Sequence, residues 1–161
     1  MKKLLKNIWI KLAIKLLSIL LLGYMLLTFV IGIYPVHGLY MFPMIKDGDL
    51  VITQKIGKYN VGDVVSYKIG NKRYFGRIVA SENDEIFINE NSYLVNGMVP
   101  TEEIFYETNT SKKGYPKMLN KGQVFILNDY RTETKDSREF GPINIKDLDG
   151  KIIFQFRRRS F

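Results

Sequence analysis

The chain has 161 residues, which suffices for one domain and a membrane anchor but not for two sizeable domains. Its net charge is +8, but five lysines precede residue 16, and the remaining 19 basic residues face 16 acidic ones, so a nucleic-acid partner is disfavoured. The absence of cysteine and the single histidine, His37, exclude a disulfide framework and a cysteine or multi-histidine metal site. We therefore expect no metal and no cofactor.

Residues 16–33 contain no charged side chain. As a helix, this run would rise about 27 Å, close to the hydrocarbon thickness of a bilayer. A cleaved signal peptide would have a shorter apolar core and a small-x-small cleavage site, and a buried core helix would have a polar face. The run therefore predicts one transmembrane helix. The lysines before it place residues 1–34 as a cytoplasmic start and anchor in the cell membrane, with residues 35–161 as an extracellular domain.

Beyond the anchor, short runs rich in β-branched and aromatic residues predict strands. Turn residues separate these runs, as at Asn96-Gly97, and no run has helical periodicity. The sequence thus predicts a mainly β, barrel-like domain of short strands, with residues 100–121 as a long surface connection. The predicted strands cover residues 49–56, 63–69, 73–80, 85–89, 93–96, 123–128 and 151–157.

Residues 38–49 read as a structured loop, because Gly38, Pro43 and Gly48 restrict the backbone. The loop resembles the segment of type I signal peptidases that carries the nucleophilic serine, written Gly-x-Ser-Met-x-Pro-Thr-Leu-x-x-Gly-Asp. In this sequence the serine position is Tyr40, and Met44 stands where the family has threonine.

Three further segments resemble the same family, in the same order. They are Val61-Gly-Asp-Val-Val-Ser-Tyr67, Tyr74-Phe-Gly-Arg-Ile-Val-Ala80, and the long segment from Leu127-Asn-Asp-Tyr-Arg131 to Asp136-Ser-Arg-Glu-Phe-Gly-Pro-Ile143. Residues 93–97 also look like the family's Asn-Gly hairpin. The resemblance covers the whole chain, anchor included, and implies the fold of a type I signal peptidase.

The resemblance also implies that the reactive pair of the family is missing. The family's lysine falls at Gly76, its serine at Tyr40, and the serine that supports the lysine at Thr134. A phenol is a poor acyl-transfer nucleophile without a base beside it. Lys72 and His37 are the candidate replacement bases, so an active type I signal peptidase with unorthodox groups remains the alternative.

The family binds an extended peptide by adding it to a strand edge, which does not require the reactive pair. We expect Tyr40 to fill the place of the serine, Gly76 to open space where the lysine stood, and the loop's large apolar side chains to extend a surface toward the bilayer. The expected peptide-binding cleft comprises Gly38, Tyr40, Met41, Phe42, Pro43, Met44, Tyr74, Phe75 and Gly76.

A second set of residues is expected to support the cleft through carboxylate–guanidinium pairs and backbone hydrogen bonds. This set comprises Arg77, Asp129, Arg131, Thr134, Asp136, Ser137 and Arg138. The chain also resembles the signal-peptidase-like proteins associated with pilus assembly in Gram-positive bacteria, which lack the serine and the lysine. That resemblance implies a chaperone-like accessory that binds pilin or a related secreted precursor, with a pilus sortase and the bilayer as further partners. A scaffold of a translocation complex is a weaker alternative.

Overall fold

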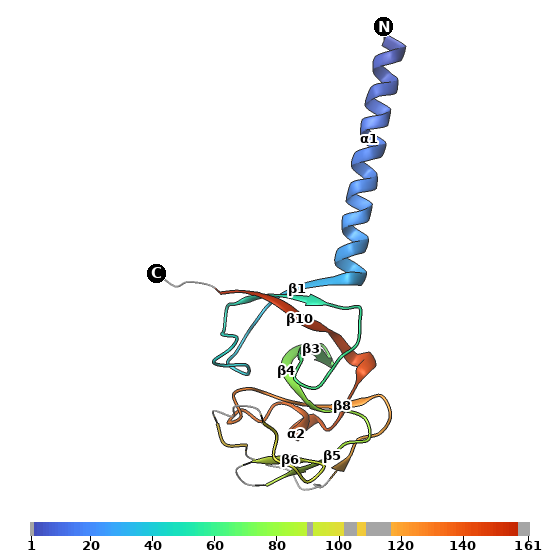
Figure 1. The fold of residues 1–161 in the computed structure, drawn as a ribbon. Coiled ribbons are helices and arrows are strands. Elements are labelled where there is room, and N and C mark those ends of the chain that lie inside the picture. The colour runs from blue at the N-terminus through green and yellow to red at the C-terminus, as the bar shows by residue number, and fades with distance from the viewer. Residues whose placement is uncertain (1, 90–91, 102–105, 109–116, 158–161) are drawn as a thin grey trace.

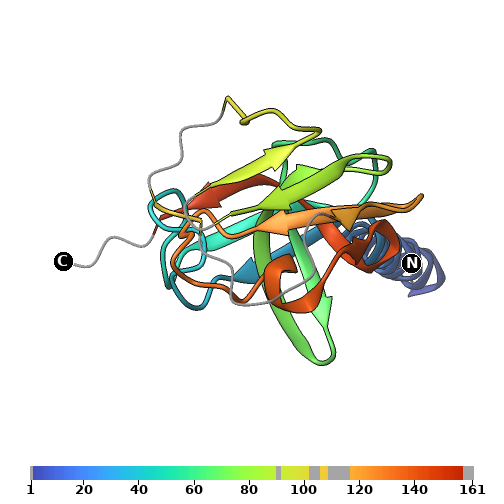
Figure 2. The same ribbon diagram turned by 90° about the horizontal axis from the view of Figure 1, so that it is seen from below.

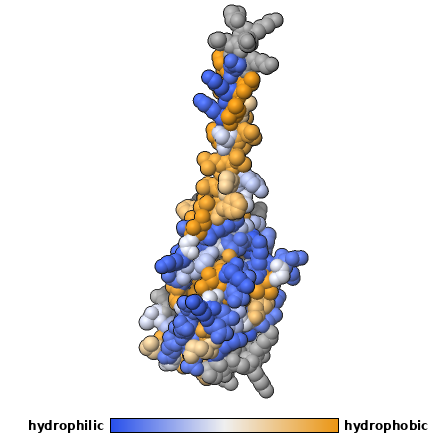
Figure 3. Space-filling model, turned by 90° about the vertical axis from the view of Figure 1, so that its right-hand side faces the viewer, coloured by the Kyte–Doolittle hydropathy of each residue, from blue (hydrophilic) through white to orange (hydrophobic). Residues whose placement is uncertain are grey.

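The computed structural model describes residues 2–89, 92–101, 106–108 and 117–157. Helix α1 (Lys2–Met25) continues through a π-helical turn, η1 (Leu26–Val30), directly into strand β1 (Ile31–Pro35). Within the described residues, one helix, Asn7–Val30, is long and apolar enough to span a membrane. It stands clear of the domain in Figure 1, and Figure 3 shows apolar surface along most of its length.

The helix ends at Val30, three residues before the expected end at Ile33. Residues 31–33 instead pair with β2, with Ile31 opposite Gln54 and Ile33 opposite Ile52. The Lys55 ammonium also donates to the Thr28 carbonyl at 2.9 Å, and the Lys55 amide donates to the Val30 carbonyl at 2.8 Å. These bonds satisfy carbonyls that the end of a helix would otherwise leave unpaired. The helix is therefore joined to the sheet without a linker.

The domain is mainly β, as predicted. A twisted seven-stranded antiparallel sheet has the order β1-β2-β10-β3-β4-β8-β9, and a three-stranded sheet has the order β6-β5-β7 (Figures 1 and 2). The strands after β1 are β2 (Leu50–Gln54), β3 (Val64–Ile69), β4 (Lys72–Ala80), β5 (Glu85–Ile88), β6 (Tyr93–Val95), β7 (Lys117–Met118), β8 (Gln123–Leu127), β9 (Ile143–Asn144) and β10 (Leu148–Phe156).

All seven predicted strands are present, while β1, β7 and β9 were not predicted. Strand β1 was read as the end of the apolar run, and β7 and β9 are two residues long, too short to leave a pattern. Two short helices, α2 (Ser137–Phe140) and the 3-10 turn η2 (Ile145–Asp147), complete the fold. The predicted Asn-Gly turn is present: Asn96 and Gly97 have φ of 52° and 77°, and the backbones of Val95 and Met98 exchange two hydrogen bonds.

The expectation of a surface connection over residues 100–121 holds only in part. Residues 102–105 and 109–116 lie outside the described residues. Of the remainder, Thr108 and Leu119 are buried, and β7 pairs with β5. Leu119 belongs to the core between the small sheet and strands β4 and β8, so the end of this segment is part of the packed domain.

The outer face of β1, β2 and β10 is apolar, although a sheet face that meets water is normally polar. The strand register places Ile33, Ile52 and Phe154 in one row across the sheet, and Pro35, Leu50 and Phe156 in the next. About half of the surface of Ile33, Phe154 and Phe156 is exposed. This layer is the part of the domain nearest to the anchor in Figure 1.

Candidate functional site

The loop of residues 36–49 is held in one shape by its own polar groups. The Val36 amide donates to the Asp49 carbonyl at 2.8 Å, and the Gly48 amide donates back to the Val36 carbonyl at 2.9 Å. The Asp47 carboxylate accepts from the Gly38 amide at 2.7 Å. Gly38 has φ of +90°, and a Cβ there would lie 2.8 Å from the Tyr40 ring, so only glycine fits. The expectation of a structured loop is correct.

Buried apolar side chains of the loop pack it against the core of the domain. Val36, Met41 and Ile45 are buried and share a core cluster with Val51 and Phe75. Met41 is 1% exposed and Phe75 3%, so the expectation that Met41 extends an apolar surface was wrong, and neither residue presents a cleft surface. The alternation of buried and exposed positions in a loop depends on its turns, which a sequence pattern does not give.

The exposed side of the loop includes the three residues between Met41 and Ile45. Pro43 and Met44 are exposed, and Phe42 is half-buried with its ring edge-on to Tyr130, 6.4 Å between centroids. The Met44 carbonyl accepts from the Gln155 amide group at 3.1 Å, which ties this side of the loop to β10. Phe42, Pro43 and Met44 are thus among the loop residues that a partner could contact, together with the exposed His37 and Leu39.

Tyr40 lies against a cluster of aromatic rings. Its backbone carbonyl accepts from the Tyr130 amide at 2.9 Å, and its ring is edge-on to Tyr74 at 6.2 Å. Tyr74 in turn stacks on Tyr67 at 5.8 Å and contacts Phe140 at 5.1 Å. We refer to Tyr40, Tyr67, Tyr74 and Phe140 as the aromatic cluster. Among the described residues, no side chain forms a hydrogen bond with the Tyr40 hydroxyl.

Tyr67 is the buried member of the aromatic cluster, and the sequence analysis did not single it out. Its hydroxyl has no hydrogen-bond partner among the described residues. Burial raises the pKa of Tyr67 far above its usual value, and the nearby Asp136 carboxylate raises it further. The phenol therefore stays neutral. The Gly70-Asn71 turn could have revealed this position, since a hairpin centred there sets Tyr67 opposite Tyr74.

Gly76 does not open space, contrary to expectation. A Cβ at this position would lie 2.4 Å from Cγ2 of Ile126, 3.3 Å from the Leu127 carbonyl oxygen and 3.6 Å from Cε1 of Tyr67. The side chain of Ile126, on strand β8, therefore fills the place where a side chain at position 76 would begin. The glycine at position 76 therefore leaves no free space for the Tyr40 ring, because the Ile126 side chain already occupies that space.

The two candidate replacement bases are both exposed. His37 is an exposed loop residue, and Lys72 begins β4 opposite Ile69. The turn of the β3–β4 hairpin projects from the domain in Figure 2. Neither side chain has an interaction with Tyr40 among the described residues. Within the part of the chain that the structure describes, no nucleophile–base pair is therefore assembled around Tyr40.

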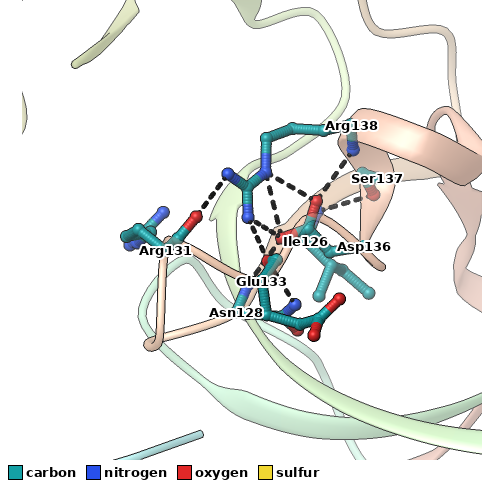
Figure 4. A network of polar contacts seen from close by, with 7 residues as sticks. All are labelled: Ile126, Asn128, Arg131, Glu133, Asp136, Ser137 and Arg138. Atoms are coloured by element: carbon teal, nitrogen blue, oxygen red, sulfur yellow. Dashed lines mark hydrogen bonds and ion pairs between the residues drawn. The ribbon is translucent and has the colours of Figure 1, made fainter. Parts of the chain in front are cut away.

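Asp136 and Arg138 form a buried ion pair that closes the turn after β8 (Figure 4). The Asp136 carboxylate accepts from the Arg138 guanidinium at 2.6 Å and from the Asn128 amide at 2.9 Å. The Arg138 guanidinium also donates to the carbonyls of Arg131 and Glu133, at 2.7 and 2.6 Å. Both side chains of the pair are 0% exposed, so the network joins the strand end to the following loop in a dry environment.

The remaining residues of the expected support set lie around this network. The Ser137 hydroxyl accepts from the Ile126 amide at 2.9 Å, and the Arg131 guanidinium lies over the Tyr93 ring. Thr134 contributes its backbone carbonyl, which accepts from the Asp136 amide at 2.8 Å. Ser137 thereby fixes the strand that carries Ile126, the residue that packs against Gly76.

A second ion pair joins β4 to the loop after β8. Arg77 binds both carboxylate oxygens of Asp129, at 2.8 and 2.6 Å, and donates to the Gly62 carbonyl at 2.8 Å. Its guanidinium also lies 3.5 Å from the Met44 sulfur. Arg77 therefore links the exposed side of the loop to the frame beneath it. Within the described residues, no three histidine or carboxylate side chains come together in a way that could hold a metal ion.

Comparisons with known proteins point to one family. The family model "Signal peptidase, peptidase S26" matches residues 9–157. Thylakoidal processing peptidase 1 of Arabidopsis thaliana is 30% identical over 72% of the chain, but the match spans only 39% of that longer protein. Two Staphylococcus aureus proteins match nearly end to end: "Inactive signal peptidase IA" at 27% identity over 91% of each chain, and "Signal peptidase IB" at 28% over 97% of this chain and 91% of that one.

A solved structure shares the fold. The crystal structure of a signal peptidase I from Enterococcus faecalis matches with a TM-score of 0.50 and 16% identity, over 60% of this chain and 97% of that one.

Proposed function

The chain belongs to the signal peptidase family, peptidase S26, and we propose that it is a non-catalytic, membrane-anchored member that binds an extended segment of a pilin or a related secreted precursor. The supporting observation is the packing at the two positions that the resemblance assigns to the reactive pair. Tyr40 has no base at its hydroxyl among the described residues, and Ile126 fills the place of a side chain at position 76.

Hydrolysis by serine and lysine requires a hydroxyl within hydrogen-bond reach of a lysine that is desolvated enough to lose its proton. Among the described residues, no lysine lies within hydrogen-bond reach of the Tyr40 hydroxyl, and position 76 carries no side chain. A close relative carries "inactive" in its name, so loss of activity on this fold has a parallel. The proposal that this chain does not cleave peptides rests on the residues at these two positions.

Peptide binding has a physical basis beside Tyr40. Strand β4 pairs with β3 from Lys72 onward, but its pairing with β8 begins only at Arg77. Between these points, the described residues leave one edge of β4 without a strand partner. That edge includes Tyr74, whose ring contacts Tyr40. An extended peptide added there would bind through backbone hydrogen bonds and contact the aromatic cluster and Phe42.

The apolar helix and the apolar outer face of the sheet support the proposal that the bilayer and a pilus sortase are further partners. The lysines before the apolar run favour a cytoplasmic start, which places the domain outside the cell membrane. The exposed apolar face of β1, β2 and β10 adjoins the anchor and suits contact with the bilayer. In this setting the chain would present pilin subunits to a pilus sortase as a chaperone-like accessory.

The test uses the full chain in lipid nanodiscs with a fluorescent peptide from a candidate pilin and, separately, an intact precursor protein. We expect saturable peptide binding without cleavage. Phe42→Glu should weaken binding at least tenfold, because it places a charge on the exposed side of the loop, whereas Ile56→Glu, at an exposed position outside that loop, should not. Gly76 is unsuitable for this test, because a larger residue there disturbs the packing. Failure to bind any pilin or precursor would remove the proposal.

An active signal peptidase with unorthodox groups is the second candidate, and the similarity to "Signal peptidase IB" favours it. It predicts that the nanodisc preparation releases mature protein from the precursor. It also predicts that Tyr40→Phe, which removes the hydroxyl and keeps the ring, abolishes release.

A further inference from the structure

The small sheet has an apolar outer face at the end of the domain farthest from the anchor (Figure 1). The inner side chains Ile86, Ile88 and Tyr93 are buried in the core, whereas Phe87 and Met118 point outward and are exposed. Phe87 pairs with Leu94 across the sheet, and Met98 follows the Asn96-Gly97 turn with 70% of its surface exposed. Exposed apolar side chains gathered in this way mark interaction sites. The apolar helix lies at the opposite end of the domain, so a bilayer around it would not cover them.

This face contains a hollow of about 310 Å³ lined by Glu85, Phe87, Leu94 and Gly97. This volume lies at the lower end of the range for ligand pockets and suits one long side chain better than a cofactor. Two of the lining residues are apolar, and one is a carboxylate. We refer to this feature as the distal hollow.

Among the described residues, none pairs with the Glu85 carboxylate, which can therefore accept a cation. Its backbone is paired with Asn96, but no described residue donates to or forms an ion pair with its side chain. Lys117, on the neighbouring strand, is opposite Ile86 and not Glu85, and its ammonium approaches Gly141. Lys117 is the basic residue on the small sheet, and it does not neutralise the Glu85 carboxylate.

A second carboxylate strengthens the negative charge beside the distal hollow. Burial alone would raise the pKa of Asp84, but hydrogen bonds from Ser81 and Asn96 outweigh it and lower that pKa. Asp84 therefore stays ionised at neutral pH next to Glu85 in a chain whose net charge is +8. A cationic ligand is thus favoured over an anionic one at this end of the molecule.

We infer that the distal hollow binds a lysine or arginine side chain of a partner protein. The aliphatic stem of that residue would pack on Phe87 and Leu94 while its charged end pairs with Glu85, and flanking apolar residues of the partner would cover Met98 and Met118. This combination of an apolar floor and one free carboxylate fits a basic side chain next to large apolar residues. The inference concerns a surface separate from Tyr40 and does not depend on the proposed function.

The experiment observes ¹³C-labelled methionine methyl groups of the full chain in nanodiscs. The probes are two acetylated peptides, Gly-Leu-Lys-Leu-Gly and Gly-Leu-Glu-Leu-Gly. We expect the lysine peptide to shift the Met98 and Met118 signals saturably, and the glutamate peptide to leave them unchanged. Met41 in the core and Met44 beside the Arg77 guanidinium are internal controls whose signals should not move.

Two variants identify the groups that bind. Glu85→Gln keeps the shape and should weaken binding of the lysine peptide about two- to fivefold, the range for one partly exposed ion pair. Phe87→Ser should abolish the shifts, whereas Glu107→Lys, an exposed charge change outside the distal hollow, should not alter them. Equal shifts with both peptides, an unchanged affinity for Glu85→Gln, or movement of Met44 in place of Met98 and Met118 would each overturn the inference.

Discussion

Replacing Gly76 by alanine should destabilise the domain, because two opposing effects differ in size at this position. Gly76 is not among the glycines with positive φ, so alanine fits the backbone and by itself would stabilise by about 0.4–1 kcal/mol through the unfolded state. The new Cβ, however, would lie 2.4 Å from Ile126, and overpacking of this kind costs about 1–3 kcal/mol. The clash outweighs the entropic gain, so we expect a net loss of about 1–2 kcal/mol.

A double-mutant cycle isolates the cause. Ile126 is 0% exposed, so Ile126→Ala alone should cost about 2–5 kcal/mol by leaving a cavity. In Gly76→Ala with Ile126→Ala, the added methyl group enters that cavity. The double variant should therefore be more stable than the sum of the two single changes predicts, by about 0.5–3 kcal/mol.

The free energies of unfolding come from guanidinium unfolding of the full chain in detergent micelles, followed by near-UV circular dichroism of the buried tyrosines. If Gly76→Ala left the free energy of unfolding unchanged, or if the losses of the two single variants added up exactly in the double variant, the contact with Ile126 would not be what excludes a side chain at position 76. The same cycle bears on reactivation. If Ile126 fills the space, Tyr40→Ser with Gly76→Lys should neither fold well nor cleave a precursor.

Three further outcomes follow from contacts described above. Asp136→Asn should lower the free energy of unfolding by about 3–5 kcal/mol, because it removes the carboxylate that pairs with the buried Arg138 guanidinium. Asp129→Asn should cost clearly less in the same assay, because the ion pair of Asp129 with Arg77 is partly exposed. Tyr67→Phe should leave stability unchanged or raise it by up to about 1 kcal/mol, since the hydroxyl is buried without a partner; a loss would reveal a bound donor or acceptor. A nitroxide attached at Phe154→Cys, on the face proposed to contact the bilayer, should be relaxed more by oxygen than by a water-soluble nickel chelate. A nitroxide at Lys117→Cys, on the small sheet, should show the reverse, and both labels are specific because the chain has no cysteine of its own.

Local features of the fold could be predicted from the sequence. The charge-free run revealed the anchor, and most strands followed from β-branched and aromatic runs between turn residues. The pairing of Asp136 with Arg138 could also be anticipated, since the two residues are neighbours in one turn. In each case the partners lie within a few residues of one another.

Features that depend on distant contacts could not be predicted. The space beside Gly76 is decided by Ile126, fifty residues later, and the burial of Met41 by a core that includes Val51 and Phe75. Strand β1 was missed because isoleucine at the end of an apolar run suits both a membrane helix and a strand, and only pairing with β2 decides between them. These features arise from tertiary packing.

The direct passage from the helix to β1 limits how far the domain can move relative to the helix. Because Lys55 binds carbonyls at the end of the helix, a bilayer around this helix would hold the distal hollow at a fixed distance from the lipid surface. The hollow would then turn with the helix about its axis. Under the proposals above, a partner whose basic segment lies at the same distance from the lipid would bind in preference to one whose segment lies closer or farther away.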